Sequence, residues 1–205
     1  NGAGNLGIYL HVSRGADSKR FHAYPENVSP TVFAFTFEVP APPVADKTEA
    51  KTYSVTTTQD LRWKRCNIKS TALLGNVMHF NQGYAGGNNE TILYNSDGEL
   101  TEASACNVYV VKDGVIATPE TDHQILPGIT RLLLLQILRA DGSLKIEERA
   151  VSVDELRAAD EVWISSSTKE IAPVTLIDDE PVGDGNIGDI WQQAQSLFSQ
   201  HKYDY

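Results

Sequence analysis

Alternating apolar and polar positions predict two strands within the first forty residues. Residues 8–13 and 31–38 place aromatic or branched side chains at every second position, which is the pattern of a half-buried strand. The segment that follows, 39–43, holds three prolines in five residues, and proline cannot continue a hydrogen-bonded ladder. We therefore expect residues 39–43 to be an interdomain linker between a first domain at 1–38 and a second at 44–205.

The second part of the chain begins with a mixture of strand and helix patterns. Strands are predicted at 52–57, 91–94 and 107–111, and an Asp-Gly turn signal follows each of the last two. We expect this part to be a run of antiparallel strands. Apolar residues at 73, 74, 77 and 78 have the spacing of a helix, which the glycines at 83, 86 and 87 are expected to end.

The last third of the chain adds further helices and a strand. Residues 130–139 are apolar on nearly every side and precede Asp141-Gly142, which predicts a buried helix with a glycine stop. Ser152 and Glu155 have the form of a capping box before a predicted strand at 161–165. Residues 187–203 have amphipathic helical spacing. Because strands and helices mix without a strict βαβ rhythm, the expected fold class is α+β.

Composition and charge narrow the possible functions. The 205 residues are 41% hydrophobic and 21% charged, an ordinary globular balance that argues against disorder. The net charge of −10 leaves no basic surface for nucleic acid or an anionic membrane. The five histidines and two cysteines show no metal-ligand spacing, so no metal site is expected. Two cysteines outside any CxxC pair favour a reducing compartment, which we take to be the cytoplasm.

One local pattern suggests a phosphate site. Gly128 and Thr130 lie at the start of the helix predicted at 130–139, where free backbone N–H groups and a hydroxyl could bind an anion. An ordinary helix cap accounts for the same residues. A second signal is therefore needed.

Four collinear segments supply that signal. They are Asp60–Asn76 (DLRWKRCNIKSTALLGN), Leu100–Val108 (LTEASACNV), Gly128–Arg131 (GITR) and Ser165–Val174 (SSSTKEIAPV). Together they resemble the motifs of the fold-type-IV pyridoxal-phosphate enzymes, the class IV aminotransferases. The resemblance implies a two-domain enzyme with a mixed or antiparallel sheet in its cofactor domain, and pyridoxal 5'-phosphate as its cofactor.

The resemblance also implies roles for individual residues. Lys69 would form a Schiff base with the cofactor, and Glu102 would face the ring nitrogen and keep it protonated. Arg62 would support the cofactor site, and Leu126 would pack on the ring. The phosphate would be held by Ile129, Thr130, Ser166 and Ser167. Outside these motifs, Lys69 would be interpreted as a solvated lysine, Glu102 as an exposed glutamate at a strand end and Leu126 as a core residue.

The implied substrate is a D-amino acid, with a 2-oxo acid as acceptor. Ser13-Arg14-Gly15 followed by Arg20 and His22 is most similar to the D-amino-acid aminotransferases, in which an Arg-x-His element binds the substrate carboxylate of the neighbouring subunit. On an extended segment, residues at i and i+2 share one face. A homodimer follows from this resemblance. Polar residues on a surface loop are the alternative interpretation of the pair.

Three other functions stay open at this point. Branched-chain aminotransferases and aminodeoxychorismate lyases of the same family use the same lysine and glutamate. A non-catalytic or truncated cofactor-binding protein is the third, since a fold does not guarantee an activity.

The start of the chain bears on that third alternative. The family carries a segment before the strand at Ile8, with a phosphate-binding arginine and an active-site tyrosine, so we expect that residues have been removed in front of Asn1. Residues 1–38 would then be the end of the small domain.

Overall fold

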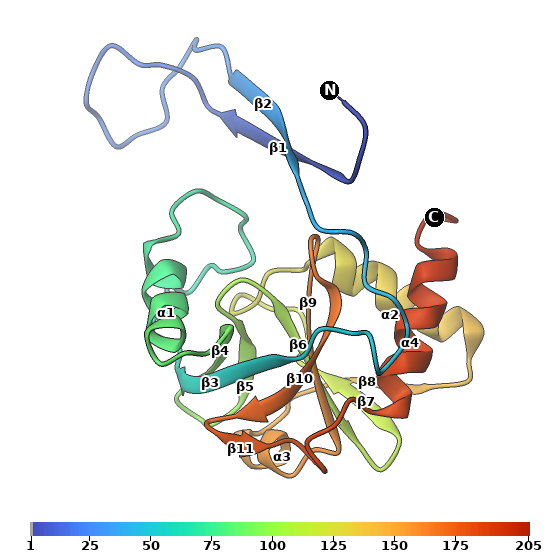
Figure 1. Cartoon of the computed structure of the whole chain (residues 1–205). Coiled ribbons are helices and arrows are strands. Elements are labelled where there is room, and N and C mark those ends of the chain that lie inside the picture. Colours follow the sequence, from blue (N-terminus) through green and yellow to red (C-terminus); the bar gives the residue numbers. More distant parts are fainter. Residues whose placement is uncertain (1) are drawn as a thin grey trace. The chain divides into compact units, whose positions relative to one another are not determined.

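The computed structural model describes residues 2–205 and divides into two compact units, with the division between Pro42 and Pro43 (Figure 1). The first unit is a two-stranded antiparallel sheet of β1 (Leu6–Ser13) and β2 (Thr31–Glu38). Both strands were predicted, and β1 begins two residues earlier than expected. Residues 14–30 form the loop that joins them.

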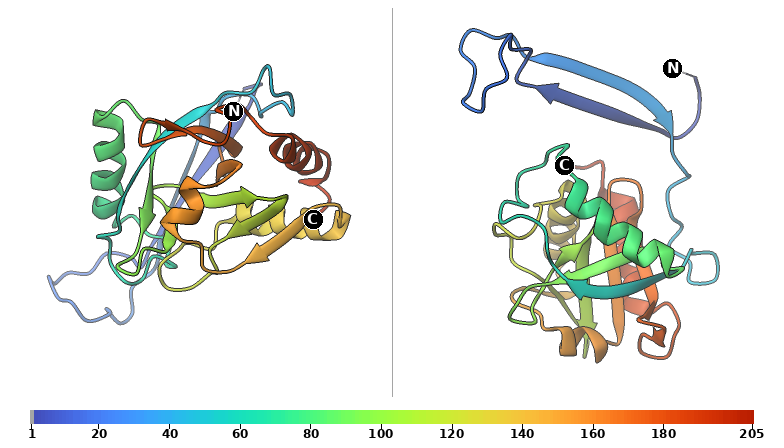
Figure 2. Two further views of the ribbon diagram at one scale, coloured as in Figure 1. Left: turned by 90° about the horizontal axis from the view of Figure 1, so that it is seen from below. Right: turned by 90° about the vertical axis from the view of Figure 1, so that its left-hand side faces the viewer.

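The second unit is built on one curled, mixed sheet of nine strands (Figures 1 and 2). The strand order is β5-β4-β3-β10-β9-β6-β7-β8, and β11 pairs with β10. The strands are β3 (Tyr53–Gln59), β4 (Glu90–Tyr94), β5 (Leu100–Ala103), β6 (Asn107–Lys112), β7 (Val115–Thr118), β8 (Lys145–Glu148), β9 (Glu161–Ser166), β10 (Glu170–Ile177) and β11 (Glu180–Pro181). The predicted α+β class is confirmed.

The expected run of antiparallel strands is wrong in one part. β3 and β4 are parallel, in register from Val55↔Glu90 to Gln59↔Tyr94, whereas β4–β5 and β6–β7 are antiparallel. The connection between β3 and β4 contains helix α1 (Leu74–Ala85), and a crossover of this length is what parallel neighbours require. Apolar alternation gives a strand but not its direction, which is why the sequence pattern did not reveal the parallel pair.

Two helices cover one face of the sheet. They are α2 (Ile129–Asp141) and α4 (Asp189–His201), which contact each other and the strands β9 and β10. Trp163 of β9 and Trp191 of α4 are fully buried in the shared core. α2 ends as expected, because Gly142 adopts the left-handed conformation with φ of 74° that glycine tolerates best. The apolar side chains of both helices therefore hold them against the sheet.

The short helix α3 (Val153–Arg157) forms half of the predicted capping box. The Ser152 hydroxyl accepts a hydrogen bond from the Glu155 N–H at 3.1 Å. The Glu155 carboxylate instead binds Arg149 at 2.5 Å. The serine cap is thus confirmed, and the glutamate serves an ion pair.

The apolar positions of α1 do not face the core of this chain. His79 and Gly83 are the helix residues buried against the sheet, whereas Leu74, Val77 and Met78 are 73%, 57% and 65% exposed. The helical spacing of the apolar residues was predicted correctly, yet the apolar side of the helix is open. Across residues 2–205, no helix has both the length and the apolar character needed to cross a membrane.

Candidate active site

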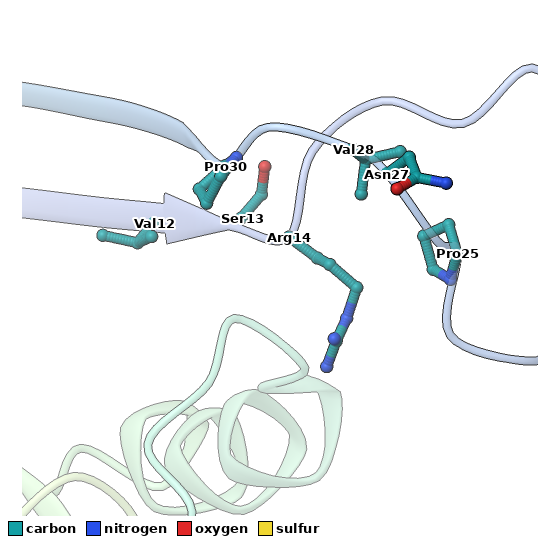
Figure 3. A pocket seen from close by; sticks show the side chains of 7 residues that line it. All are labelled: Val12, Ser13, Arg14, Pro25, Asn27, Val28 and Pro30. Atoms are coloured by element: carbon teal, nitrogen blue, oxygen red, sulfur yellow. The ribbon is translucent and has the colours of Figure 1, made fainter.

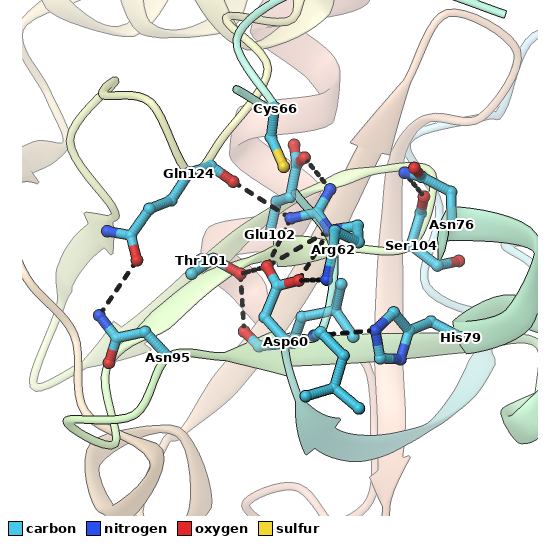
Figure 4. Close-up of polar contacts among 12 residues, drawn as sticks. Asp60, Arg62, Cys66, Asn76, His79, Asn95, Thr101, Glu102, Ser104 and Gln124 are labelled. Carbon is cyan, nitrogen blue, oxygen red and sulfur yellow. Dashed lines mark hydrogen bonds and ion pairs between the residues drawn. The ribbon is translucent and has the colours of Figure 1, made fainter. Parts of the chain in front are cut away.

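A charged cluster lies where β3 ends and the chain turns toward α1 (Figure 4). The Arg62 guanidinium donates to Asp60 Oδ2 at 2.7 Å, to Glu102 Oε1 at 2.5 Å and to the Gln124 carbonyl at 3.1 Å. The Thr101 hydroxyl adds a second donor to Asp60 Oδ2 at 2.9 Å. The side chains of Arg62, Asp60 and Glu102 are only 2%, 11% and 7% exposed. One arginine therefore holds two buried carboxylates in place.

The Glu102 carboxylate is fixed at both oxygens. Arg62 binds Oε1, and Oε2 accepts the Leu126 N–H at 3.0 Å and the Asn107 amide at 3.4 Å. Glu102 comes from β5, and Leu126 lies shortly before α2. Because each carboxylate oxygen has two lone pairs, Oε1 keeps acceptor capacity for one more donor. The alternative interpretation of Glu102 as an exposed glutamate at a strand end is wrong, since Glu102 is buried.

Burial and charge pull the pKa values of this cluster in opposite directions. Burial raises the pKa of Glu102, although the charge and hydrogen bond of Arg62 oppose the shift. At Asp60 burial also disfavours ionisation, but the bonds and charge of Arg62 outweigh it and lower the pKa. Burial disfavours the Arg62 cation, yet the two carboxylates raise its pKa. The cluster therefore contains a permanent cation between two acids in different environments.

A neutral histidine supports the chain as it leaves β3. His79 Nε2 accepts the Leu61 N–H at 3.1 Å, and burial lowers the pKa of His79. A neutral ring can accept this bond, whereas the charged ring has no acceptor. α1 thereby holds the start of the segment that carries Arg62 and Lys69.

The N-terminus of α2 lies beside this cluster and has no side-chain cap among the described residues. Gly128 is the N-cap residue. Ile129 is 74% exposed and Thr130 half-buried, so the first N–H groups of the helix are available as donors. A Cβ at Gly128 would lie 2.2 Å from Asn107 Oδ1. A larger residue at position 128 would therefore displace the Asn107 amide.

Ser166 and Ser167 lie at the end of β9 and in the turn after it. β9 neighbours β6, with Asn107 opposite Ser165, which places this end of β9 beside the residue that contacts both Glu102 and Gly128. The Ser166 hydroxyl accepts the Lys169 N–H at 3.3 Å. The preceding Ser165 instead binds Tyr109 at 2.9 Å on the buried face.

The structure places the predicted lysine in a loop. Lys69 lies between β3 and α1 and is exposed. No hydrogen bond or ion pair joins its side chain to another of residues 2–205. Leu126, half-buried, lies beside Glu102 through its backbone N–H. Of the predicted residues, Arg62, Glu102 and Leu126 are thus in direct contact.

Arg20 and His22 lie in the first unit, both exposed in the loop between β1 and β2. A pocket of about 410 Å³ opens at the base of this loop (Figure 3). It is lined by Val12, Ser13, Arg14, Pro25, Asn27, Val28 and Pro30. Arg14 is the charged residue of this lining, and its guanidinium lies 4.2 Å from the ring centroid of Tyr24. Arg20 and His22 are outside the lining of this pocket.

Two residues of the cluster were not among the predicted site residues. Asp60 accepts the N–H of Arg62, two residues further on, at 2.9 Å, a local turn typical of aspartate that could have suggested the pair. Asn107 gave no such signal, because an asparagine at the start of a strand is ordinarily a turn residue. Its contacts with Glu102 and Leu126 depend on the tertiary fold.

Two free thiols adjoin the site. The Cys66 N–H donates to the His123 carbonyl, and its Sγ lies 3.1 Å from the Trp63 carbonyl. Cys106 Sγ lies 3.6 Å from Glu90 Oε2. Burial raises the pKa of Cys66 and raises that of Cys106 to about 12. Both side chains therefore remain thiols at neutral pH.

A comparison with protein families shows which family the chain belongs to. Residues 1–177 match the family model described as amino-transferase class IV. The chain belongs to this family. Class IV aminotransferases use pyridoxal 5'-phosphate, so the resemblance of the four motifs and the expected cofactor are confirmed.

The curated relatives of this class IV chain include D-alanine aminotransferases. The enzyme of Bacillus licheniformis is 42% identical over 190 residues, which are 93% of this chain and 65% of the relative. That of Staphylococcus epidermidis strain RP62A is 40% identical over 202 residues, 98% of this chain and 70% of the relative. The chain thus spans about two thirds of the length of these relatives.

Solved structures support the fold. The holo form, with pyridoxal phosphate, of a branched-chain amino acid aminotransferase from Thermobaculum terrenum matches with a TM-score of 0.82 at 21% identity, over 96% of this chain and 64% of that one. At this identity the match establishes a shared fold.

Proposed function

We propose that the protein transfers an amino group between a D-amino acid and a 2-oxo acid with pyridoxal 5'-phosphate as cofactor. The observation that carries the proposal is the buried Glu102 carboxylate, held by Arg62 and Leu126 beside the uncapped N-terminus of α2. The carboxylate is a negative binding region and the helix N-terminus a positive one, and Leu126, which binds the carboxylate, lies shortly before the helix. A protonated ring nitrogen and a phosphate on one small molecule match them.

The phosphate would be held by donors that the fold already presents. The N–H groups of Ile129 and Thr130, together with the Thr130 hydroxyl, start the helix, whose dipole favours an anion. The hydroxyls of Ser166 and Ser167, on the neighbouring strand end, complete the set. Leu126 would pack against the ring.

Glu102 would accept a hydrogen bond from the protonated ring nitrogen and so favour the cationic form of the ring. Pyridoxal phosphate supplies an electron-withdrawing ring that stabilises negative charge at the substrate α-carbon. Arg62 keeps Glu102 in place and opposes the effect of burial on its ionisation. Asp60 also binds Arg62 and shares its positive charge. The negative charge of Glu102 is therefore only partly neutralised and can attract the cationic ring.

Lys69 is the residue that would attach the cofactor covalently. Once displaced by the substrate amine, its amino group would take the proton from the substrate α-carbon as a base and return it to the cofactor C4′ as an acid. Lys69 lies in the loop between β3 and α1 and makes no ion pair with the described residues, which leaves the amine available for both steps.

We place the substrate α-carboxylate at Arg20 and His22, which would bind it by charge-assisted and neutral hydrogen bonds. The support comes from their spacing in an exposed loop and from the similarity to D-alanine aminotransferases at 42% and 40% identity. The first unit would then be the end of a small substrate-binding domain, linked to the cofactor domain by residues 39–43.

We further propose a homodimer that buries the apolar side of α1. Residues 70–89 contain no charged side chain, so two copies of a chain with a net charge of −10 can meet there without repulsion. Leu73, Leu74, Val77, Met78 and Tyr84 are between 47% and 73% exposed. A patch of this kind suits an isologous contact, which needs about 800 Å² per partner.

Light scattering tests the dimer directly. Met78→Glu is expected to give monomers, whereas Leu132→Glu, at an exposed position of α2, leaves the dimer intact. Wild-type protein that is monomeric at micromolar concentration would contradict this part of the proposal.

We also place the protein in the cytoplasm, where its two free thiols stay reduced. Fractionation of source cells tests this location.

Two related activities compete with the main one. Branched-chain transamination is supported by structural neighbours, but those are 21% to 25% identical, whereas the D-alanine aminotransferases cited above are 40% and 42% identical. An aminodeoxychorismate lyase activity would use the same lysine and glutamate. A protein that binds the cofactor without catalysis is the remaining alternative.

One assay separates these possibilities. The purified protein is incubated with pyridoxal phosphate, D-alanine and 2-oxoglutarate, and pyruvate is measured. L-Leucine and L-valine are tested in place of D-alanine by the branched 2-oxo acids that they would form. Aminodeoxychorismate is tested without 2-oxoglutarate, and pyruvate released from it supports the lyase alternative. Pyruvate from D-alanine supports the proposal. A preference for the L-amino acids supports the branched-chain alternative. Cofactor binding without turnover of any substrate supports the non-catalytic one.

A further inference from the structure

One amide joins the two binding regions of the site. Asn107, the first residue of β6, is only 6% exposed. Its Nδ2 donates to the Leu126 carbonyl at 2.9 Å and to Glu102 Oε2 at 3.4 Å. Its Oδ1 is 2.2 Å from the position that a Cβ on Gly128 would occupy, so it lies directly against that glycine. A single side chain therefore touches the carboxylate and both ends of the turn that leads into α2.

These contacts form a closed triangle. The Leu126 N–H donates to the same Glu102 oxygen that Asn107 contacts, while Asn107 binds the Leu126 carbonyl. The carboxylate, the turn and the amide thus restrain one another. A closed set of hydrogen bonds fixes relative positions better than a single bond does, because no member can move without straining the other two.

The triangle is anchored to the sheet. Asn107 pairs with Ser165 of β9, directly before Ser166. The backbone of Asn107 therefore belongs to the strand pair that carries the serine hydroxyls, while its side chain holds Glu102 and the turn before Ile129.

We infer that Asn107 is a positioning residue that sets the distance between the Glu102 carboxylate and the N-terminus of α2, so that one cofactor can engage both. This inference rests on the proposed function. Asn107 itself need not touch the cofactor, since it acts through Glu102 and through the turn at Leu126 and Gly128.

Equilibrium binding of pyridoxal phosphate, followed by fluorescence, tests the inference without reference to turnover. Asn107→Ala is expected to weaken binding about tenfold, because the Leu126 carbonyl loses its donor and Glu102 loses one of its restraints. In a Glu102→Gln background, where the charge to be positioned is absent, the same change is expected to cost less than about threefold. Equal losses in the two backgrounds would mean that Asn107 only stabilises the fold, and would overturn the inference.

A second variant keeps the test informative if Asn107→Ala folds poorly. Asn107→Asp is nearly isosteric, but its ionised carboxylate cannot donate to Leu126 and repels Glu102. Protonation restores a donor, so binding relative to wild type should recover as the pH falls from 8 to 6, in a range raised by the neighbouring carboxylate. Binding that weakens further over this range, relative to wild type, would also overturn the inference.

The matched control is Asn89→Ala. Asn89 accepts hydrogen bonds from the Ser54 N–H at 2.9 Å and the Ser54 hydroxyl at 3.3 Å, at the end of β3 opposite to Arg62. Its loss is expected to leave cofactor affinity unchanged. Wild-type protein that binds no pyridoxal phosphate would contradict the proposed function and this inference with it, whereas normal wild-type binding with additive variants would contradict the inference alone.

Discussion

Removal of the Arg62 cation is the most informative perturbation of the site. Arg62→Met keeps much of the side-chain volume and deletes the charge that Asp60 and Glu102 share. The two carboxylate side chains are 11% and 7% exposed, so water cannot replace the lost donor. Thr101 still binds Asp60, and the Leu126 N–H still binds Glu102.

The size of the effect follows from this burial. Breaking a buried pair by removal of one partner costs about 3–5 kcal/mol, because the other charge stays buried. For a domain of this size, about 1 kcal/mol lowers the melting temperature by roughly 2–4 °C. Arg62→Met should therefore melt on the order of 10 °C below wild type at pH 8.

The loss should depend on pH in a defined direction. Without Arg62, burial and mutual repulsion raise the pKa values of both carboxyls above those of the unfolded chain. The folded variant then binds more protons than the unfolded one, so its stability falls as the pH rises through this range. The gap between wild type and variant should be smallest at pH 5 and largest at pH 8.

Thermal melts of the cofactor-free proteins, followed by circular dichroism at pH 5 and pH 8, measure both quantities. Arg157→Met is the control, because Arg157 is 60% exposed and lies 3.8 Å from Asp178, a surface pair worth little. If Arg62→Met melts within about 2 °C of wild type at pH 8, the buried cluster does not contribute as argued.

Three further predictions concern the chemistry. Lys69→Ala should abolish covalent attachment of the cofactor, and borohydride reduction with peptide mapping of wild type should place the pyridoxyl group on Lys69; its recovery on Lys64 would contradict the assignment. Glu102→Gln should still bind the cofactor but slow the first half-reaction in stopped-flow spectra, since an amide cannot favour the ring cation; an unchanged rate would remove Glu102 from this role. Arg20→Ala should lower kcat/KM by about one to two decades for every D-amino acid, from a lost charge-assisted bond of about 1.5–3 kcal/mol, and leave the cofactor spectrum unchanged. Arg20→Lys should recover part of this loss, because an ammonium lacks the planar fork, and His22→Ala should have a smaller effect than Arg20→Ala. Unaltered kinetics with D-alanine would contradict this use of Arg20.

Local patterns predicted the helices and the strands β1, β2, β3, β4, β6 and β9, whereas β5, β7, β8, β10 and β11 were not predicted. The spacing in residues 130–139 and 187–203 identified α2 and α4, because amphipathic and buried helices differ in sequence from strands. Strand direction was not predictable, and β3–β4 is parallel for reasons of connection rather than composition. Nor could periodicity indicate that Met78 lies on an open surface, since the same spacing serves a core and an interface.

The site was predictable only in part. Arg62 and Glu102 were proposed from the motifs, and the fold joins them at 2.5 Å across forty residues of sequence. Asp60 and Asn107 were not singled out, because each acquires its role from a partner that the tertiary fold brings to it. Both residues lie inside the quoted motif segments, but the contacts that give them their place in the site depend on packing.

The two buried thiols have a practical consequence for labelling. Only the thiolate reacts with maleimides, and burial keeps Cys66 and Cys106 protonated and shielded. A cysteine placed outside the apolar side of α1, as in Leu132→Cys on α2, would therefore be modified selectively without removal of the native ones. A fluorophore there would report by energy transfer on the approach of two copies, and the reactivity of Cys106 would serve as an internal gauge of unfolding.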